Sequence, residues 1–444
     1  MRWEQKVQCA SLSDVGFRRR NNQDSHATMF SPDAETFQIR GHLFIVADGM
    51  GGHAFGELAS QIAVETIPHV YFKNRSDDIS TALNAAILAA NTAVNEKGSQ
   101  NSDFNRMGTT CVALALGPKG AVVGHVGDSR LYRIRNNQID QLTFDHSLEW
   151  ELIRHGHMKV NGQSLPEIKH VITRSIGPEP DVEPEVGGPF PVWAGDTFLL
   201  CSDGLSGLVK DAEIGAIAKH LPPSDACQLL VNLSNQRGGP DNITVIIAEV
   251  GPLPEGVALQ PDEIPVQASE SDPLDWLCLG GLGAFTLTFA FGVLFFVQQE
   301  AERSHGIVLS VLSLFAFALI FVFWRRHARS RISDTPTPVV STVLSKACRT
   351  ASAKLTADLL AALAKTESDM QQTAATEQWP LDTAAQETAG AAAKEALNKK
   401  QWPAALKEFA KSIDLLMTAW KQHRKIVAVR DGEAKAAKEK EAQS

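Results

Sequence analysis

Short apolar runs separated by glycine, aspartate and proline turns characterise the first 250 residues of the chain. The runs are rich in valine, isoleucine, leucine and phenylalanine, a composition that predicts β-strands. The predicted strands are His42–Ala47, Thr110–Leu116, Ala121–Val126, Thr197–Cys201 and Thr244–Val250. Apolar residues recur at helical spacing in Glu57–Val70 and Ile79–Asn95. Because strands and helices come in clusters rather than in strict alternation, we predict an α+β domain over residues 1–250.

The pattern changes after residue 250. Residues 251–273 are rich in proline and acidic side chains and have no period, which predicts a linker. Two apolar stretches follow, at 274–297 and 307–324. Residues 276–297 and the whole of 307–324 carry no charged side chain. Stretches of this length predict a hairpin of two transmembrane helices. A buried helical hairpin in a soluble core is the alternative.

Arginines follow the second apolar stretch immediately, at positions 325, 326, 329 and 331. The positive-inside rule places such a basic end in the cytoplasm, and a hairpin places both chain ends on the same side. The first residues also lack the apolar run of a secretory signal. We therefore expect a multi-pass inner-membrane protein whose α+β domain and C-terminus face the cytoplasm.

The C-terminal quarter has a helical composition. A basic juxtamembrane linker is predicted over 325–345, and the segment 346–444 is rich in alanine, lysine and glutamate, which favour helix. The phrase QWPAALKEFAKSIDLL resembles one helical hairpin of the tetratricopeptide type, although a generic amphipathic bundle matches it equally well. A protein partner for this region is one expectation.

Charge and cysteine content exclude some functions. The net charge is -9, and no strongly basic segment covers the α+β domain, so nucleic-acid binding is not expected. The 6 cysteines are scattered, without a paired spacing typical of zinc ligands. A disulfide framework is not expected either.

Five aspartates stand at or beside the ends of apolar runs, several of them next to glycine. They are Asp24 in RRRNNQDS, Asp48 in FIVADGMGGH, Asp128 in HVGDSR, Asp203 in LLCSDGLSG and Asp241 in GGPDNITV. One Asp-Gly pair alone is usually a turn. Carboxylates that converge repel one another unless a cation neutralises them, and together with glycine carbonyls they form the oxygen set that Mg²⁺ or Mn²⁺ prefers. The pattern therefore predicts a metal site.

The order of the motifs is specific. The series R-x-x-x-x-D, A-D-G-M-G-G-H, M-G-T-T, H-V-G-D-S-R, S-D-G-L and D-N-I-T resembles the PPM-type protein phosphatases, also called type 2C, in their bacterial form. The resemblance covers about residues 1–250. It implies a central sandwich of two antiparallel sheets flanked by helices, with a metal site at one end. It also implies metal-dependent hydrolysis of phosphoserine and phosphothreonine. Together with the predicted membrane hairpin, this suggests that the substrates are cytoplasmic proteins at the membrane.

The resemblance assigns metal-binding roles position by position. Asp48 would bridge two ions, Mn²⁺ or Mg²⁺, and the carbonyl of Gly49 would bind one of them. Asp203 and Asp241 would complete the shell of the other ion. Asp24 would support the second ion, directly or through water.

The same resemblance assigns a third ion and the phosphate. Asp128 matches the aspartate used for a third metal, and Arg19 matches the arginine that binds the phosphoryl group. Arg18 and Arg20 are neighbours, so the register of this arginine stays open. Arg19, Asp48 and Asp203 would be the catalytic set, with a metal-bound hydroxide attacking phosphorus directly. Met50 stands where eukaryotic members carry a histidine, which leaves the general acid open.

A rival interpretation is a non-catalytic scaffold or sensor that uses a phosphatase-like domain to bind phosphorylated partners. The presence of every expected metal aspartate favours the enzyme. Its expected partners are phosphorylated cytoplasmic proteins, including serine/threonine kinases and their substrates, and the membrane.

Overall fold

The computed structural model describes residues 7–51, 54–100, 107–154, 171–251, 314 and 347–441. By their internal contacts, Met1–Pro254 and Val340–Ser444 form one compact unit, and Glu255–Val339 forms another. The helices and strands named below belong to the first unit.

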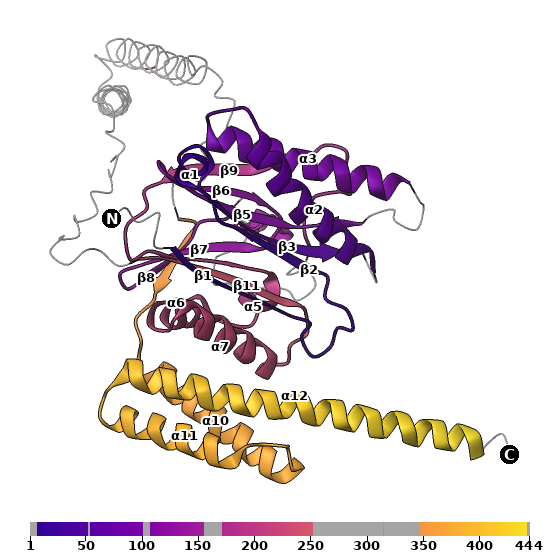
Figure 1. The fold of residues 1–444 in the computed structure, drawn as a ribbon, viewed down its shortest axis with the longest axis vertical. Coiled ribbons are helices and arrows are strands. Elements are labelled where there is room, and N and C mark those ends of the chain that lie inside the picture. Colours follow the sequence, from indigo (N-terminus) through magenta and orange to yellow (C-terminus); the bar gives the residue numbers. More distant parts are fainter. Residues whose placement is uncertain are drawn as a thin grey trace, which may run out of the picture. The chain divides into compact units, whose positions relative to one another are not determined.

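Two antiparallel six-stranded sheets lie at the centre of this unit (Figure 1). The first sheet has the order β1-β11-β10-β7-β8-β12. Its strands are β1 (Val7–Asp14), β7 (Arg130–Arg135), β8 (Gln138–Gln141), β10 (Thr197–Cys201), β11 (Ile243–Val250) and β12 (Arg349–Ser352). The second has the order β2-β3-β5-β6-β9, with β4 paired to β3. Its strands are β2 (Asp24–Met29), β3 (His42–Met50), β4 (Gly108–Thr109), β5 (Cys111–Gly117), β6 (Gly120–Val126) and β9 (Glu185–Phe190).

Alternating side chains of each strand face opposite layers, as the pleat of a β-strand requires. In β3, Phe44 and Val46 pack between the two sheets. Leu43 and Ile45 face the other way, into a cluster shared with α2 (Ala54–Lys73) and α3 (Ile79–Ser99). These two helices therefore cover the outer face of the second sheet (Figure 1).

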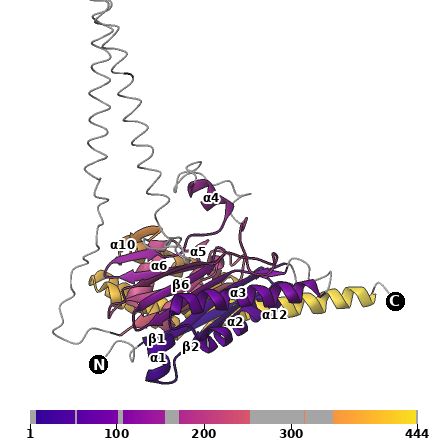
Figure 2. The same cartoon turned by 90° about the horizontal axis from the view of Figure 1, so that it is seen from above.

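The first sheet is built by the same rule. Ile246 of β11 faces the space between the sheets, whereas Val245 and Ile247 face outward. The outward cluster includes α6 (Asp211–His220) and α7 (Pro223–Gln236). Three short helices complete the domain, namely α1 (Ala34–Arg40), α4 (Leu148–Arg154) and α5 (Asp203–Ser206). Figure 2 shows α4 projecting beside the sandwich.

The C-terminal segment joins the same unit. Its strand β12 pairs with β8, with Thr350 opposite Asp140. The helices that follow are α10 (Ala357–Glu377), α11 (Thr383–Asn398) and α12 (Trp402–Glu441). Asn232 of α7 donates a hydrogen bond to Asp414 of α12 at 3.0 Å, and the apolar side chains of α10 and α12 continue the cluster around α6 and α7. The C-terminal helices thus share a core with the sandwich.

The predicted α+β sandwich of two antiparallel sheets flanked by helices is present. The five predicted strands correspond to β3, β5, β6, β10 and β11, and the two predicted helices lie within α2 and α3. The domain boundaries drawn from the sequence stay predictions.

The prediction of a transmembrane hairpin is not supported. A membrane-spanning helix needs about 20 consecutive, largely apolar residues, and within the described ranges no helix is long and apolar enough. Apart from Leu314, the stretches 274–297 and 307–324 lie outside the described residues. The fold class is therefore corrected to an α+β sandwich with C-terminal helices, because the described residues contain no membrane-spanning hairpin. The predictions of a multi-pass inner-membrane location and of the membrane as a partner are corrected with it, because both rested on the hairpin.

Shortening a buried side chain in the core of the C-terminal helices should destabilise the protein strongly. Phe409 of α12 is fully buried in the cluster that α12 shares with α6 and α7. Phe409→Ala should lower the free energy of unfolding by about 3–5 kcal/mol, because it removes apolar contacts and leaves a cavity. Denaturant titration would measure this, with the exposed change Lys411→Ala as control. A loss no larger than that of the control would contradict the packing described here.

Candidate active site

The five motif aspartates lie at strand ends and turns at one end of the sandwich. Asp48 lies near the end of β3, and Asp24 begins β2 directly opposite it in the antiparallel register. Asp128 follows β6, Asp203 begins α5 immediately after β10, and Asp241 precedes β11. Residues far apart in the sequence therefore meet because their strands are neighbours in the two sheets.

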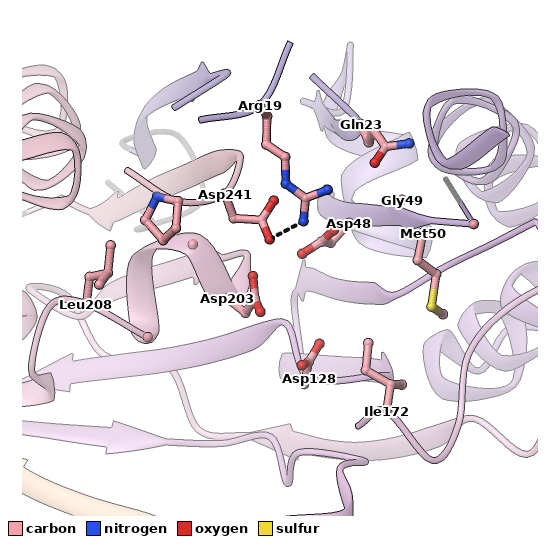
Figure 3. Close-up of a pocket in the computed structure, with 14 residues that line it drawn as sticks. Arg19, Gln23, Asp48, Gly49, Met50, Asp128, Ile172, Asp203, Leu208 and Asp241 are labelled. Carbon is pink, nitrogen blue, oxygen red and sulfur yellow. Dashed lines mark hydrogen bonds and ion pairs between the residues drawn. The ribbon is translucent and has the colours of Figure 1, made fainter. Parts of the chain in front are cut away.

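A pocket of about 640 Å³ opens at this end. Its walls include Arg19, Asp48, Asp128, Asp203 and Asp241 (Figure 3). The carboxylates point toward a shared space, and the Arg19 side chain extends over it from the rim. Gln23, Gly49, Met50, Gly51, Ile172, Gly204, Gly207, Leu208 and Pro240 complete the lining.

The carboxylates are held in an environment that disfavours negative charge. Burial raises the pKa of Asp48 well above its usual range, and the charges of Asp24 and Asp203 raise it further. Burial also raises the pKa of Asp24 to about 7, although a hydrogen bond from Ser202 opposes the shift. For Asp128, burial and then the charge of Asp203 raise the pKa to about 7. Such a cluster gains stability from a cation.

The donor set suits divalent cations. Carboxylate and carbonyl oxygens are the ligands that Mg²⁺ and Mn²⁺ prefer. One oxygen of Asp24 and one of Asp128 are buried and have no hydrogen-bond partner within the described part of the chain. Buried polar atoms are normally satisfied, so oxygens of this kind are available as ligands or for ordered water. The residues present therefore fit a metal centre.

Asp24 lies next to Asp48 in the same sheet, directly opposite it in the strand register. It is not one of the residues that line the pocket. The Ser202 hydroxyl donates to Asp24 Oδ2 at 2.7 Å. Of the two roles left open by the sequence, this placement favours support through an intervening group over direct ligation.

The backbone around Asp48 leaves no room for larger side chains. A Cβ on Gly49 would lie 2.0 Å from the carbonyl oxygen of Gly56. The Asp48 amide donates to Thr110 Oγ1 at 3.0 Å, and the Thr110 amide donates to the Asp48 carbonyl at 2.8 Å. Thr110 belongs to the M-G-T-T motif and has a supporting function that sequence reasoning did not assign.

Arg19 is the arginine of the RRR run that reaches the pocket. Its Nη2 donates to Asp241 Oδ2 at 2.8 Å (Figure 3). Arg18 and Arg20 are exposed and do not line the pocket. The register that the sequence left open is therefore the one in which Arg19 faces the aspartates.

Asn242 was also missed by sequence reasoning. Its side chain accepts a hydrogen bond from the Gln23 amide at 2.8 Å and donates to the carbonyls of Val15 and Asn21. It thereby fastens both ends of the loop that carries Arg19. The signal for this role was the Asn of the D-N-I-T motif.

A buried cluster of His125, His146 and Glu185 lies beside the Asp128 turn. Their potential ligand atoms are within 4.8 Å of one another, so these residues could also hold a metal ion. Burial lowers the pKa of His125 strongly, and the neighbouring His146 lowers it further, so the His125 ring is held neutral. The Gly127 amide donates to His146 Nδ1 at 3.0 Å. We interpret the cluster as support for the turn that presents Asp128.

The cysteines near the site are not nucleophiles at neutral pH. Cys111 and Cys201 are fully buried in strands. Burial raises the pKa of Cys111 to about 12 and raises that of Cys201 further. Since the thiolate is the reactive form, neither thiol is suited to covalent attack.

Comparison with known proteins decides the family. The sequence profile of the family described as protein phosphatase 2C matches residues 18–235. The serine/threonine phosphatase stp of Listeria innocua is 34% identical over 249 residues, which make up 55% of this chain and 96% of that protein. The chain belongs to the protein phosphatase 2C family. The predicted family and the predicted enzyme class, a protein phosphatase, are thereby confirmed.

Solved structures of bacterial serine/threonine phosphatases match just over half of this protein phosphatase 2C chain. The serine/threonine phosphatase of S. agalactiae is 34% identical, covers 55% of this chain and 99% of its own, and superposes with a TM-score of 0.50. The catalytic domain of the phosphatase PstP, solved in complex with 2 manganese ions, is 34% identical, covers 55% of this chain and 98% of its own, and has a TM-score of 0.47. The C-terminal helices lie beyond the residues that the family profile matches.

Proposed function

We propose that this phosphatase hydrolyses phosphoserine and phosphothreonine in proteins with the help of two divalent cations, Mn²⁺ or Mg²⁺. One observation carries the proposal. The carboxylates of Asp48, Asp203 and Asp241 meet in a single pocket, and the guanidinium of Arg19 stands at its rim (Figure 3). A site that hydrolyses phosphate esters with metal ions needs carboxylates that bind the cations and a guanidinium group that binds the phosphate.

The ligands that we propose are those implied by the family resemblance. Asp48 and the Gly49 carbonyl would hold one cation, and Asp48, Asp203 and Asp241 would hold the other. Asp128 lines the same pocket and would take a third. Bound there, the cations would supply charge neutralisation for the phosphate and a lowered pKa for water.

The protein itself positions the substrate. Arg19 presents parallel N–H donors, which match the oxygens of a phosphate dianion. Met50, Ile172 and Leu208 give the pocket apolar walls that can contact the carbon atoms of a phosphorylated side chain. The described residues of the lining include no histidine. We propose that water in the pocket donates the proton that the serine or threonine alkoxide oxygen takes up as its bond to phosphorus breaks.

The substrates that suit this site are phosphorylated proteins. We propose that they include serine/threonine kinases and the targets of those kinases. Attack by water needs no covalent phosphoenzyme, which agrees with the buried, high-pKa thiols of Cys111 and Cys201.

Removal of metal from the full chain is the direct test. After treatment with EDTA and dialysis, release of phosphate from a phosphothreonine peptide should stop, and Mn²⁺ should restore it by at least about 100-fold. A phosphotyrosine peptide serves as the specificity control and should be turned over more slowly. If the protein binds Mn²⁺ and the phosphopeptide but releases no phosphate, the scaffold interpretation is correct and the proposal is wrong.

A further inference from the structure

The C-terminal helix α12 contacts the loop that carries Arg19. This loop joins β1 to β2, and α12 reaches its first residues from the side of α7. Lys421 Nζ donates to Asp14 Oδ2 at 2.6 Å, and Arg424 Nη2 donates to the carbonyl of Phe17 at 2.9 Å. The residues on the two sides of each contact are 407 positions apart in the sequence.

Aromatic packing reinforces these hydrogen bonds. The rings of Phe17 and Trp420 meet edge to face, with their centroids 4.6 Å apart. The Arg424 guanidinium lies over the Phe17 ring at 4.3 Å. Trp420 is in turn stacked on Trp379, which follows α10, at 5.6 Å. The Phe17 ring therefore contacts two side chains of α12, Trp420 and Arg424.

The opposite side of the same loop is fastened to the turn that carries Asp241. The amides of Phe17 and Arg18 both donate to the carbonyl of Gly239, at 2.8 and 3.2 Å. Gly16, at φ +76, lies so close that a Cβ would be 2.2 Å from the carbonyl oxygen of Asp241. Phe17 thus lies between α12 and the Gly239–Asp241 turn.

Arg19 lies between these anchors and the end of the loop at residues 21–23, which Asn242 fastens. It is exposed and lies in a loop between strands, and its side chain is fixed by the ion pair with Asp241. An exposed ion pair contributes only about 0–1 kcal/mol, which is too little to hold a loop in place. The contacts at Phe17, only two residues before Arg19, are more numerous than this single ion pair.

We propose that α12 is a positioning element for phosphate binding, in which Trp420, Lys421 and Arg424 hold the Phe17 loop so that Arg19 faces the pocket. The C-terminal helices would then tune the affinity of the phosphatase for phosphorylated substrates. The inference rests on the proposed role of Arg19 in binding phosphate. It assigns a task to a region that the family profile does not match.

Steady-state kinetics of the full chain would test the inference. Arg424→Ala removes the hydrogen bond and the cation–π contact to Phe17 from an exposed side chain, so the fold should be retained. With a phosphothreonine peptide and Mn²⁺, we expect KM to rise at least about 5-fold, the lower end of typical coupling between sites. The inhibition constant of inorganic phosphate should rise by a similar factor, while kcat should change less. Lys421→Ala should act in the same direction.

Asp414→Ala is the matched control. It removes a contact of α12 with α7 at Asn232, and no contact of Asp414 with the Phe17 loop is found among the described residues. Its KM should stay within about 2-fold of the wild-type value. Thermal unfolding of all variants would show whether a general loss of stability explains the result.

A double-mutant cycle separates this inference from the proposed function. In an Arg19→Ala background, Arg424→Ala should have no further effect on KM or on phosphate inhibition, because the group it positions is absent. If Arg424→Ala and Lys421→Ala match the control while Arg19→Ala weakens phosphate binding, the positioning role is wrong and the proposed function stands. If Arg19→Ala has no effect either, both fail.

Discussion

Asp48→Asn is expected to abolish phosphatase activity without unfolding the protein. Asparagine has nearly the same shape as aspartate, but it lacks the charge that would bind two cations. Loss of a group that only supports a metal ligand costs about 10- to 100-fold in affinity or activity, so loss of a bridging ligand should cost more than about 100-fold. Initial rates with a phosphothreonine peptide at saturating Mn²⁺ would measure the loss.

The position of Asp48 is the reason for this large effect. It lies in the pocket, opposite Asp24 in the strand register and near Asp203, and burial together with these charges raises its pKa well above the usual range. The site is therefore destabilised by uncompensated charge unless a cation is bound. Mn²⁺ should raise the unfolding temperature of the wild-type protein by mass action and should have much less effect on the variant.

Asp33→Asn is a suitable control for Asp48→Asn. The Asp33 carboxylate caps α1 by accepting a hydrogen bond from the Thr36 amide, and asparagine caps helices equally well. The control should keep wild-type activity and the same response to Mn²⁺. An Asp48→Asn protein that retains a tenth or more of the wild-type rate would show that this carboxylate does not hold the catalytic cations.

Arg19→Ala is expected to reduce kcat/KM by about 100-fold. The guanidinium is the group of the pocket rim that can donate several hydrogen bonds to a phosphoryl group, and loss of one well-placed donor to developing charge costs about 10²–10³-fold. Arg19→Lys should recover only part of the activity, because an ammonium group lacks the planar fork. Stability should change little, since the ion pair with Asp241 is exposed on both sides.

The neighbouring arginines provide the comparison for Arg19. Arg18 and Arg20 have exposed side chains that do not line the pocket, so Arg18→Ala and Arg20→Ala should keep near wild-type values of kcat/KM. If one of them loses as much activity as Arg19→Ala, the phosphate would be bound in a different register. Equal and small effects at all three positions would show that no single arginine of this run binds the phosphoryl group.

Some elements of the fold could be predicted because their signal is local. The apolar run Thr197–Cys201 coincides with β10, and the helical spacing of Ile79–Asn95 marks most of α3. The start of α3 is fixed by Asp78, whose side chain accepts a hydrogen bond from the Thr81 amide. β12 (Arg349–Ser352) could not be predicted, because its polar sequence RTAS forms a strand only by pairing with β8.

The sequence by itself indicated which residues to expect at a metal site. Aspartates that follow apolar strands beside glycine indicate a cation site wherever the strands end together, and this signal is local and readable. Only the tertiary structure showed how they are arranged: that Asp24 is paired with Asp48 but does not line the pocket, that Arg19 rather than Arg18 or Arg20 lines it, and that α12 contacts the loop at Phe17. These outcomes depend on sheet register and on contacts between distant segments, and periodicity along one segment does not contain that information.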